Sequence, residues 1–234
     1  MDNGANNCSG RRYGNIKIVG MNQEFSLVDI LNFEQRYRAN FINSIGGFKS
    51  LVLIGTKGKN EQTNLAVFNS LFHLGANPPL FGFIVRPDSV ERHTLSNILD
   101  TNVFTVNHVN NDIYKQAHQT SARYQMEQSE FDEANLSVEY HEQFYAPFVK
   151  ESSIKIGAEY VRKIDLSENG TILVIVKIKL IILPNNCIAN DGFIDIEKAG
   201  TITCSGLDSY HTTKKIARLS YAKPNVVATE ITGM

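Results

Sequence analysis

One hairpin constrains the fold of this chain more than any other feature. Residues 158–166 ("AEYVRKIDL") and 171–183 ("TILVIVKIKLIIL") are rich in β-branched residues, and both runs predict strands. Only "SENG" separates them, and Asn169 and Gly170 tolerate the positive φ that a tight hairpin turn requires. The two long strands therefore pair directly, so at least part of the sheet is antiparallel.

Strand signals outnumber helix signals in the rest of the sequence. Residues 51–56, 80–86 and 103–109 are further β-branched or aromatic runs bounded by Gly, Pro or Asn. Helical periodicity appears around residues 31–45, 89–99 and 113–124, which is too sparse for a regular alternation of strand and helix. The pattern predicts a mainly β fold, a β-barrel with peripheral helices, rather than a doubly wound sheet.

Length and composition predict one folded domain with an N-terminal extension. The chain has 234 residues, of which 42% are hydrophobic, and this is enough to bury a core. The start of the sequence is rich in Asn and Gly, so we expect residues 1–26 to be disordered. We expect residues 27–234 to form a single domain, because no Pro/Gly/Ser-rich linker interrupts them.

Charge and cysteine usage argue against several classes of partner. The formal net charge is −1, which provides no basic field for nucleic acid or an anionic membrane. Cys8, Cys187 and Cys204 are far apart and form no CxxC pair, so the sequence predicts neither a metal site nor a disulfide framework. The most apolar segment, residues 172–183, is too short to span a bilayer and contains Lys177 and Lys179. We therefore expect a cytoplasmic protein with reduced thiols.

The segment after residue 86 has the pattern of an anion-binding helix start. Pro87 stops the preceding strand, and Asp88 with Glu91 matches a capping box, so a helix should begin near Asp88 or Ser89. A helix N-terminus presents unpaired N–H groups and a partial positive charge, which suit a phosphate. The side chains that could donate there are those of Arg86, Ser89, His93 and Thr94. The alternative is an ordinary capped surface helix, in which Asp88 would repel an anion.

The stretch "NLAVFNSLFHLGANPPL" at residues 64–80 is apolar yet contains several short polar side chains. Such a segment can place N–H and C=O groups along the edge of a flat ring that is rich in heteroatoms, and a flavin is the obvious candidate. The alternative is a strand whose half-buried polar residues are satisfied by their neighbours.

Several short motifs then follow one another in a recognisable order. Thr56 ends a strand, "NLAVFNS" occupies residues 64–70, and Pro78 and Pro79 open the next strand. "HTLSNI" follows at residues 93–98, "FTVN" at 104–107 and "GLDSYH" at 206–211. In this order and spacing the sequence resembles the flavin reductase-like family, which is built on the FMN-binding split barrel. The resemblance spans roughly residues 33–221.

The resemblance implies a site for FMN and a set of residues that line it. Carried over by position, the residues that would bind the cofactor are Thr56, Asn64, Ala66, Val67, Phe68, Asn69, Ser70, Arg86, Ser89, His93 and Thr94. Tyr210 and His211 would shape the place where a nicotinamide stacks, although a Tyr–His pair in a turn is also compatible with a packed aromatic ring and a solvated imidazole. No proton-transferring side chain is assigned, because a flavin carries the redox chemistry itself.

The function that the resemblance implies is transfer of hydride from NAD(P)H through bound FMN to a flavin or a protein acceptor. It also implies a homodimer with FMN near a two-fold interface. Two alternatives stay open from the sequence: a flavin-binding electron carrier without its own nicotinamide site, and a non-flavin barrel that binds an apolar ligand.

Overall fold

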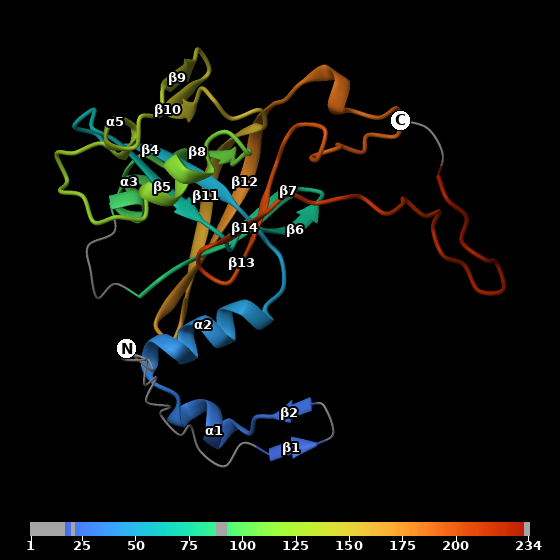
Figure 1. Ribbon diagram of the computed structural model, residues 1–234. Helices are drawn as coiled ribbons and strands as arrows, with labels where there is room; N and C mark the ends of the chain where they lie inside the picture. Colours follow the sequence, from blue (N-terminus) through green and yellow to red (C-terminus); the bar gives the residue numbers. More distant parts are fainter. Residues whose placement is uncertain (1–16, 20–21, 88–92, 232–234) are drawn as a thin grey trace, which may run out of the picture.

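A seven-stranded antiparallel sheet forms the centre of the molecule (Figure 1). The computed structural model describes residues 17–19, 22–87 and 93–231. The strand order across the sheet is β5-β4-β8-β11-β12-β7-β6. Their bounds are β4 Val52–Lys57, β5 Thr63–Phe68, β6 Phe72–Ala76, β7 Pro79–Val85, β8 Val103–His108, β11 Lys155–Leu166 and β12 Thr171–Ile182.

The predicted hairpin is confirmed. Strands β11 and β12 pair along their whole length, from Lys155 opposite Ile182 to Leu166 opposite Thr171. Gly170 has φ +70°, the conformation that the turn requires and that glycine adopts without strain. The runs at 51–56, 80–86 and 103–109 correspond to β4, β7 and β8, so the mainly β prediction is also confirmed.

Smaller sheets and short helices surround the central sheet. β1 (Lys17–Val19) pairs with β2 (Asn22–Glu24), β9 (Val138–His141) pairs with β10 (Phe144–Val149), and β13 (Thr203–Ser205) lies between β3 (Lys49–Ser50) and β14 (Ser209–His211). The helices are α1 (Leu27–Asn32), α2 (Gln35–Ile45), α3 (His93–Thr101), α4 (Tyr114–Gln119), α5 (Glu130–Glu133) and the 3₁₀ turn η1 (Asn185–Cys187). In the parts of the chain described above, no helix is long and apolar enough to cross a membrane.

The helix predictions differ from the structure in detail. The segment 31–45 contains two helices, because Phe33 leaves the helical region at the end of α1 and Glu34 caps α2. The predicted capping box of Asp88 and Glu91 lies outside the described residues. In α3 the buried face is formed by Thr94, Leu95 and Ile98, and the side chain of Leu99 is exposed.

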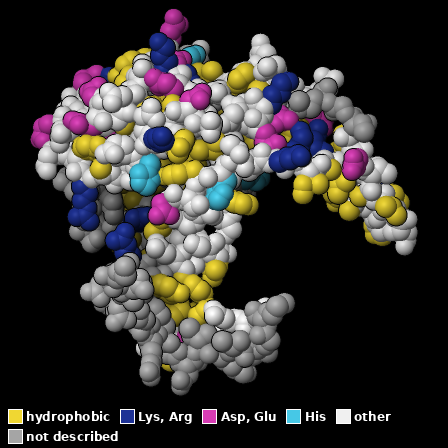
Figure 2. Space-filling view, viewed as in Figure 1, with side chains coloured by type: hydrophobic (Ala, Val, Ile, Leu, Met, Phe, Trp, Pro, Cys, Tyr) yellow, Lys and Arg dark blue, Asp and Glu magenta, His cyan; other side chains and the backbone are white. Residues whose placement is uncertain are grey.

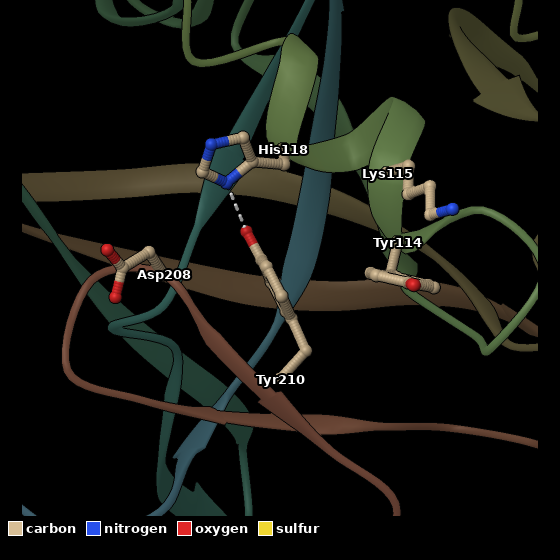
Figure 3. Close-up of a pocket in the computed structure, with 5 residues that line it drawn as sticks. All are labelled: Tyr114, Lys115, His118, Asp208 and Tyr210. Atoms are coloured by element: carbon tan, nitrogen blue, oxygen red, sulfur yellow. Dashed lines mark hydrogen bonds between the residues drawn. The ribbon is translucent and has the colours of Figure 1, made fainter. Parts of the chain in front are cut away.

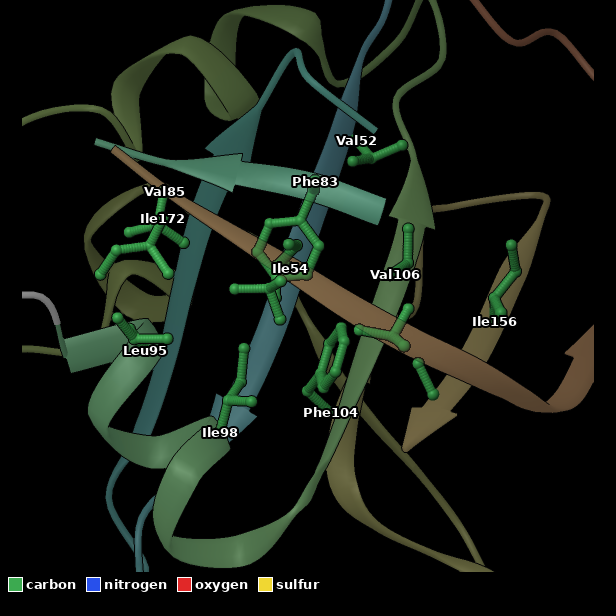
Figure 4. Packing of buried hydrophobic residues seen from close by; sticks show 13 residues of the cluster. Val52, Ile54, Phe83, Val85, Leu95, Ile98, Phe104, Val106, Ile156 and Ile172 are labelled. Carbon is green, nitrogen blue, oxygen red and sulfur yellow. The ribbon is translucent and has the colours of Figure 1, made fainter. Parts of the chain in front are cut away.

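Two hydrophobic cores lie on opposite faces of β4. Val52 and Ile54 point into a core with Phe83 and Phe104 (Figure 4). Leu53 points to the other face, into a core that includes Phe131. Because successive side chains of a strand alternate between faces, a strand covered on both sides is apolar throughout, and this explains the continuous run that begins at residue 51.

Gly55 allows the second layer to come close to the sheet. A Cβ atom at this position would lie 2.5 Å from the carbonyl oxygen of Pro147 in β10 and 2.7 Å from Oγ1 of Thr105. Thr105 donates a hydrogen bond of 2.6 Å to the same carbonyl. Only glycine fits here, and the close approach fixes β10 against β4 and β8.

Both ends of the described chain project from the sheet (Figure 1). Near the start, Phe25, Phe33, Tyr37 and Phe41 form an aromatic cluster between α1 and α2. At the other end, residues 214–231, here called the C-terminal arm, extend away from β14 with bridges between Leu219 and Glu230 and between Lys223 and Val226. Figure 2 shows an open hollow between the arm and the part of the molecule that carries α2.

Candidate functional site

The start of β5 holds a buried polar network. The Nδ2 atom of Asn64 donates to Oγ1 of Thr94 at 2.9 Å and to Oγ1 of Thr56 at 3.3 Å. Asn97 donates to the same Thr56 oxygen at 3.1 Å. Thr56 and Asn64 are opposite each other in the register of β4 and β5, and both are buried. The network therefore joins the start of α3 to the edge of the sheet.

The predicted phosphate cradle is described in part. Arg86 follows β7 directly and is exposed, and His93 and Thr94 are the first two residues of α3. Ser89 lies outside the described residues. The described members of the set therefore include a cation and the beginning of a nine-residue helix, and this combination suits an anionic group.

The outer edge of β5 has no neighbouring strand within the described part of the chain. There β5 pairs with β4 alone, so its other side carries backbone groups that point away from the sheet, while its side chains are buried or half-buried. The N–H of Leu65 points outward and donates to Oε2 of Glu130 at 2.9 Å. Because N–H groups of alternate residues point to the same edge, the Val67 N–H also faces outward. This edge provides backbone donors and acceptors of the kind predicted for a flavin ring.

Glu130 is a buried acid that the sequence did not single out. Burial raises the pKa of its carboxyl group, and the hydrogen bond from Leu65 and the nearby His93 act in the opposite direction. Neighbouring Ser129 joins the same edge through a 2.7 Å contact between its hydroxyl and that of Thr63. These contacts fix α5 against the start of β5.

The other predicted side chains along this segment point to different places. Phe68 packs against Phe83, with ring centroids 5.3 Å apart, so its ring belongs to the core. Ser70 binds both backbone groups of Ile84 through its hydroxyl, at 3.1 and 3.2 Å. Asn69 donates to the carbonyl of Gly206 at 3.5 Å and thereby contacts the turn before β14. Ala66 is half-buried opposite Ile54.

A cavity of about 340 Å³ opens beside that turn (Figure 3). Tyr210 extends from β14 toward α4, where its hydroxyl lies 2.5 Å from Nδ1 of His118. The ring of Tyr114 lies 5.5 Å from that of Tyr210, centroid to centroid. The remaining lining residues are Lys115 and Asp208. The cavity thus combines aromatic faces with one cationic and one anionic side chain.

His211 lies on the opposite side of β14 from Tyr210. Its Nε2 atom is 2.9 Å from the hydroxyl of Ser205 and 3.2 Å from that of Ser209, and its ring contacts Phe48. Adjacent residues of a strand face opposite ways, so only one of the predicted Tyr–His pair can line the cavity. The structure brings Tyr210 to the cavity and leaves His211 outside it.

The groups present fit a flavin nucleotide at the level of chemistry. The outer edge of β5 supplies N–H and C=O groups for a heteroatom-rich ring, and Arg86 with the start of α3 supplies a cation and a helix N-terminus for a phosphate.

In the described part of the chain, no three His, Cys, Asp or Glu side chains converge as a metal site would require. Burial raises the pKa of the Cys204 thiol, so this cysteine is held in its protonated form.

The sequence matches the family described as "Flavin reductase like domain" over residues 45–191. The chain belongs to this family. The match contains β4 to β12, and therefore both the edge strand and the start of α3.

Solved structures agree with the family. The fold is similar to that of a protein from Shewanella frigidimarina described as a flavin reductase with a split barrel domain, with 50% identity, a TM-score of 0.82, and coverage of 85% of this chain and 99% of that chain. It is also similar to nitrilotriacetate monooxygenase component B from Bacillus cereus, with 20% identity, a TM-score of 0.72 and coverage of 81% and 96%. An FMN-binding protein from Thermus thermophilus gives 14% identity, a TM-score of 0.58 and coverage of 70% and 86%. The predicted split barrel is confirmed.

Sequence reasoning assigned no role to three residues that contact the candidate site residues or their strand. Asn97, Glu130 and His118 contact Thr56, β5 and Tyr210, respectively. Asn97 lies within the "HTLSNI" motif and could have been found by its spacing from Thr94. Glu130 and His118 are 65 and 92 residues from their partners, and no local pattern indicates such contacts.

Proposed function

We propose that this protein binds FMN along the outer edge of β5 and uses it to oxidise NAD(P)H. The observation that carries the proposal is the position of two suitable features at one corner of the fold: an outward-facing strand edge, and a helix start joined to it by the Thr56–Asn64–Thr94 network. Membership of the flavin reductase like family supports the same site. The chemistry that such a cofactor supplies is the passage of two electrons from a nicotinamide to an acceptor.

In this proposal the residues of the chain bind and orient the cofactor and the nicotinamide. Arg86, Ser89, His93 and Thr94 would hold the phosphate, and Thr56, Asn64 and the backbone of residues 66–70 would lie along the ring and the ribityl chain. The aromatic face of Tyr210 would receive the nicotinamide, with Lys115 available to the negative charge of a pyrophosphate. The electron acceptor would be a second flavin or a protein. His118, which contacts the Tyr210 hydroxyl, would hold that ring in position.

The working form in this proposal is a cytoplasmic homodimer. The relatives support the chemistry rather than the assembly: the Shewanella protein is described as a flavin reductase, the Bacillus protein as a monooxygenase component, and the Thermus protein as binding FMN.

The test is a spectrum followed by one addition of reductant. The purified protein, or protein reconstituted with excess FMN, should show flavin absorbance at about one FMN per chain, and heat or acid should release FMN rather than FAD. Under anaerobic conditions, NADH or NADPH should bleach that absorbance within the turnover time of an ordinary enzyme, on the order of a second or less. Bound flavin that neither nucleotide bleaches would indicate an electron carrier, and the lack of any flavin after reconstitution would refute the proposal.

A further inference from the structure

The cavity beside β14 has aromatic walls that the fold holds in place. The rings of Tyr114 and Tyr210 are half-buried, their centroids are 5.5 Å apart, and both pack against the core that includes Phe131. The Tyr210 hydroxyl is also held by Nδ1 of His118, at 2.5 Å. A flat ring can therefore pack against these faces with little further ordering of the protein.

Two charged side chains of the cavity are free to meet a ligand. Lys115 and Asp208 are exposed, and within the described ranges of the chain neither side chain has a hydrogen bond or an ion pair. The ammonium nitrogen of Lys115 lies 5.8 Å from the centre of the Tyr114 ring. In Figure 3 the Tyr210 ring lies between the Asp208 carboxylate and the Lys115 side chain. The cavity therefore suits a flat ring that carries a hydrogen-bond donor at one end and an anionic group toward the other.

The cavity lies next to the strand edge proposed for the cofactor. Helix α4, which supplies three of the lining residues, contacts β5. Val67 of β5 packs against the same core as the two tyrosines. Asn69 donates to the carbonyl of Gly206, in the turn that leads to Asp208. A ring held against Tyr210 is therefore on the side of the fold where the outer edge of β5 lies.

The size of the cavity matches half of a dinucleotide. Its volume of about 340 Å³ is at the lower end of the roughly 300–1,000 Å³ that ligand cavities occupy. A nicotinamide mononucleotide has the features that the cavity selects: a flat ring, a carboxamide whose NH₂ group donates, and a phosphate. Among the described lining residues Lys115 is the one Lys or Arg, so a second phosphate would find no cation of its own there.

We propose that the cavity recognises the nicotinamide mononucleotide half of the reductant and leaves the adenosine half outside. The carboxamide NH₂ group donates to Asp208, the ring packs against Tyr210, and the phosphate lies at Lys115. The inference rests on the proposed function, because it names the part of NAD(P)H that this site reads. The 2′-phosphate that distinguishes NADPH from NADH belongs to the adenosine half, so the protein should use both nucleotides and should also accept the reduced mononucleotide alone.

Isothermal titration calorimetry of the FMN-loaded protein with oxidised ligands tests the phosphate contact. Nicotinamide mononucleotide should bind about three- to tenfold more tightly than nicotinamide riboside, which lacks the phosphate, because a charge-assisted contact at an exposed lysine is partly screened by water. Lys115→Ala should reduce this difference to less than about twofold. Lys150→Ala is the matched control: it removes an exposed lysine that does not line the cavity, and it should keep the full difference.

Nicotinic acid mononucleotide tests the other end of the cavity, because it carries a carboxylate where the amide ligand has its NH₂ group. Asp208 should repel that carboxylate and weaken binding by about tenfold relative to nicotinamide mononucleotide. Asp208→Asn removes the charge and adds a donor, so this variant should bind the acid more tightly than the wild type does. A gain of affinity cannot result from a loss of folding.

Anaerobic bleaching of the bound flavin compares whole and half reductants. NADH and NADPH should react with second-order rate constants within about threefold of each other, and the reduced mononucleotide should react within about tenfold of NADH, because the adenosine half contributes little binding. Dithionite serves as the chemical control that the flavin can be reduced at all.

A riboside that binds as tightly as the mononucleotide would overturn the proposal, and so would a phosphate effect that persists in Lys115→Ala or an acid whose binding Asp208→Asn does not improve. Bleaching by NADH without bleaching by the reduced mononucleotide, or a preference of more than about tenfold between NADH and NADPH, would overturn it as well. Bound flavin that dithionite bleaches and no nucleotide does would refute the proposed oxidation of NAD(P)H itself, and the inference with it, so the two failures are distinguished.

Discussion

Replacing Thr56 by Val should destabilise the protein because two amide groups each lose one hydrogen bond, although Asn64 keeps its bond to Thr94. Oγ1 of Thr56 accepts from Asn64 at 3.3 Å and from Asn97 at 3.1 Å, and the Thr56 side chain is completely buried. Valine has nearly the same shape, so the substitution removes the hydroxyl without leaving a cavity. Because Asn64 is buried and Asn97 is half-buried, the first amide cannot recover a partner from water as easily as the second.

An unsatisfied buried donor costs about 1–3 kcal/mol, and the weaker 3.3 Å bond and the partial exposure of Asn97 favour the lower part of that range for each. We therefore expect Thr56→Val to lower the free energy of unfolding by about 2–3 kcal/mol. Urea denaturation followed by circular dichroism measures this, and the slope against urea should be unchanged.

Thr56→Ser is the matched control. It keeps the hydroxyl and removes one methyl group, which costs about 1 kcal/mol. If Thr56→Ser destabilises the protein more than Thr56→Val, the methyl group matters more than the hydroxyl, and the network does not hold α3 against the sheet as argued here.

Arg86→Ala should weaken FMN by about tenfold or more and leave riboflavin nearly unaffected, since a charge-assisted contact to phosphate contributes roughly 1.5–3 kcal/mol; equal losses in a fluorescence titration would contradict this role. Val67→Pro should abolish FMN binding or the fold, because it removes an outward N–H and fixes φ, whereas Val67→Ala should bind normally. Wild-type protein should lose about 2–3 kcal/mol of stability between pH 6.5 and 4, because burial lowers the pKa of His108 to about 4 and only the unfolded chain takes up a proton in that range. His108→Gln should flatten this acid limb, and an unchanged limb would show that other groups cause it. Burial raises the pKa of the Glu130 carboxyl group, so the protonated group stabilises the fold and this contribution is lost as pH rises through the raised pKa. The stability of Glu130→Gln relative to the wild type should therefore be higher at pH 7 than at pH 4. Thermal melts of both proteins at both pH values measure this, and an equal difference between them at the two pH values would contradict it.

The central sheet could be predicted because its signals are local. The β11–β12 hairpin depends on two β-branched runs and a turn of four residues, and all three lie within one continuous segment. Strands β6, β9, β10, β13 and β14 were not predicted. They are three to six residues long and are interrupted by Gly, Pro or polar residues, so they carry little periodicity.

The sequence grouped residues 56–70 with the start of α3, and the structure brings Thr56, Asn64 and Thr94 into contact. Whether they bind a flavin is the subject of the proposal above. The Ser70 hydroxyl was expected at a ligand, and in the structure it binds both backbone groups of Ile84, since a half-buried hydroxyl next to a strand can bond to either. The contact of His118 with Tyr210 depends on the packing of α4 against β14, which no local sequence pattern contains.

The order of the strands has a consequence during synthesis. β7 carries Phe83, one of the largest side chains of the core. Its neighbour β12 is made much later, because Ile172 of β12 pairs with Val85 of β7 and the two are 87 residues apart in the sequence. At about 5–20 residues per second, a ribosome needs roughly 4–17 seconds to deliver β12 after β7 has been made. During that interval one edge of β7 lacks the strand that pairs with it in the sheet, and the core around Phe83 is incomplete. Nascent chains that stop before residue 171 should therefore stay bound to chaperones, and release should begin only when the second strand of the long hairpin has left the exit tunnel.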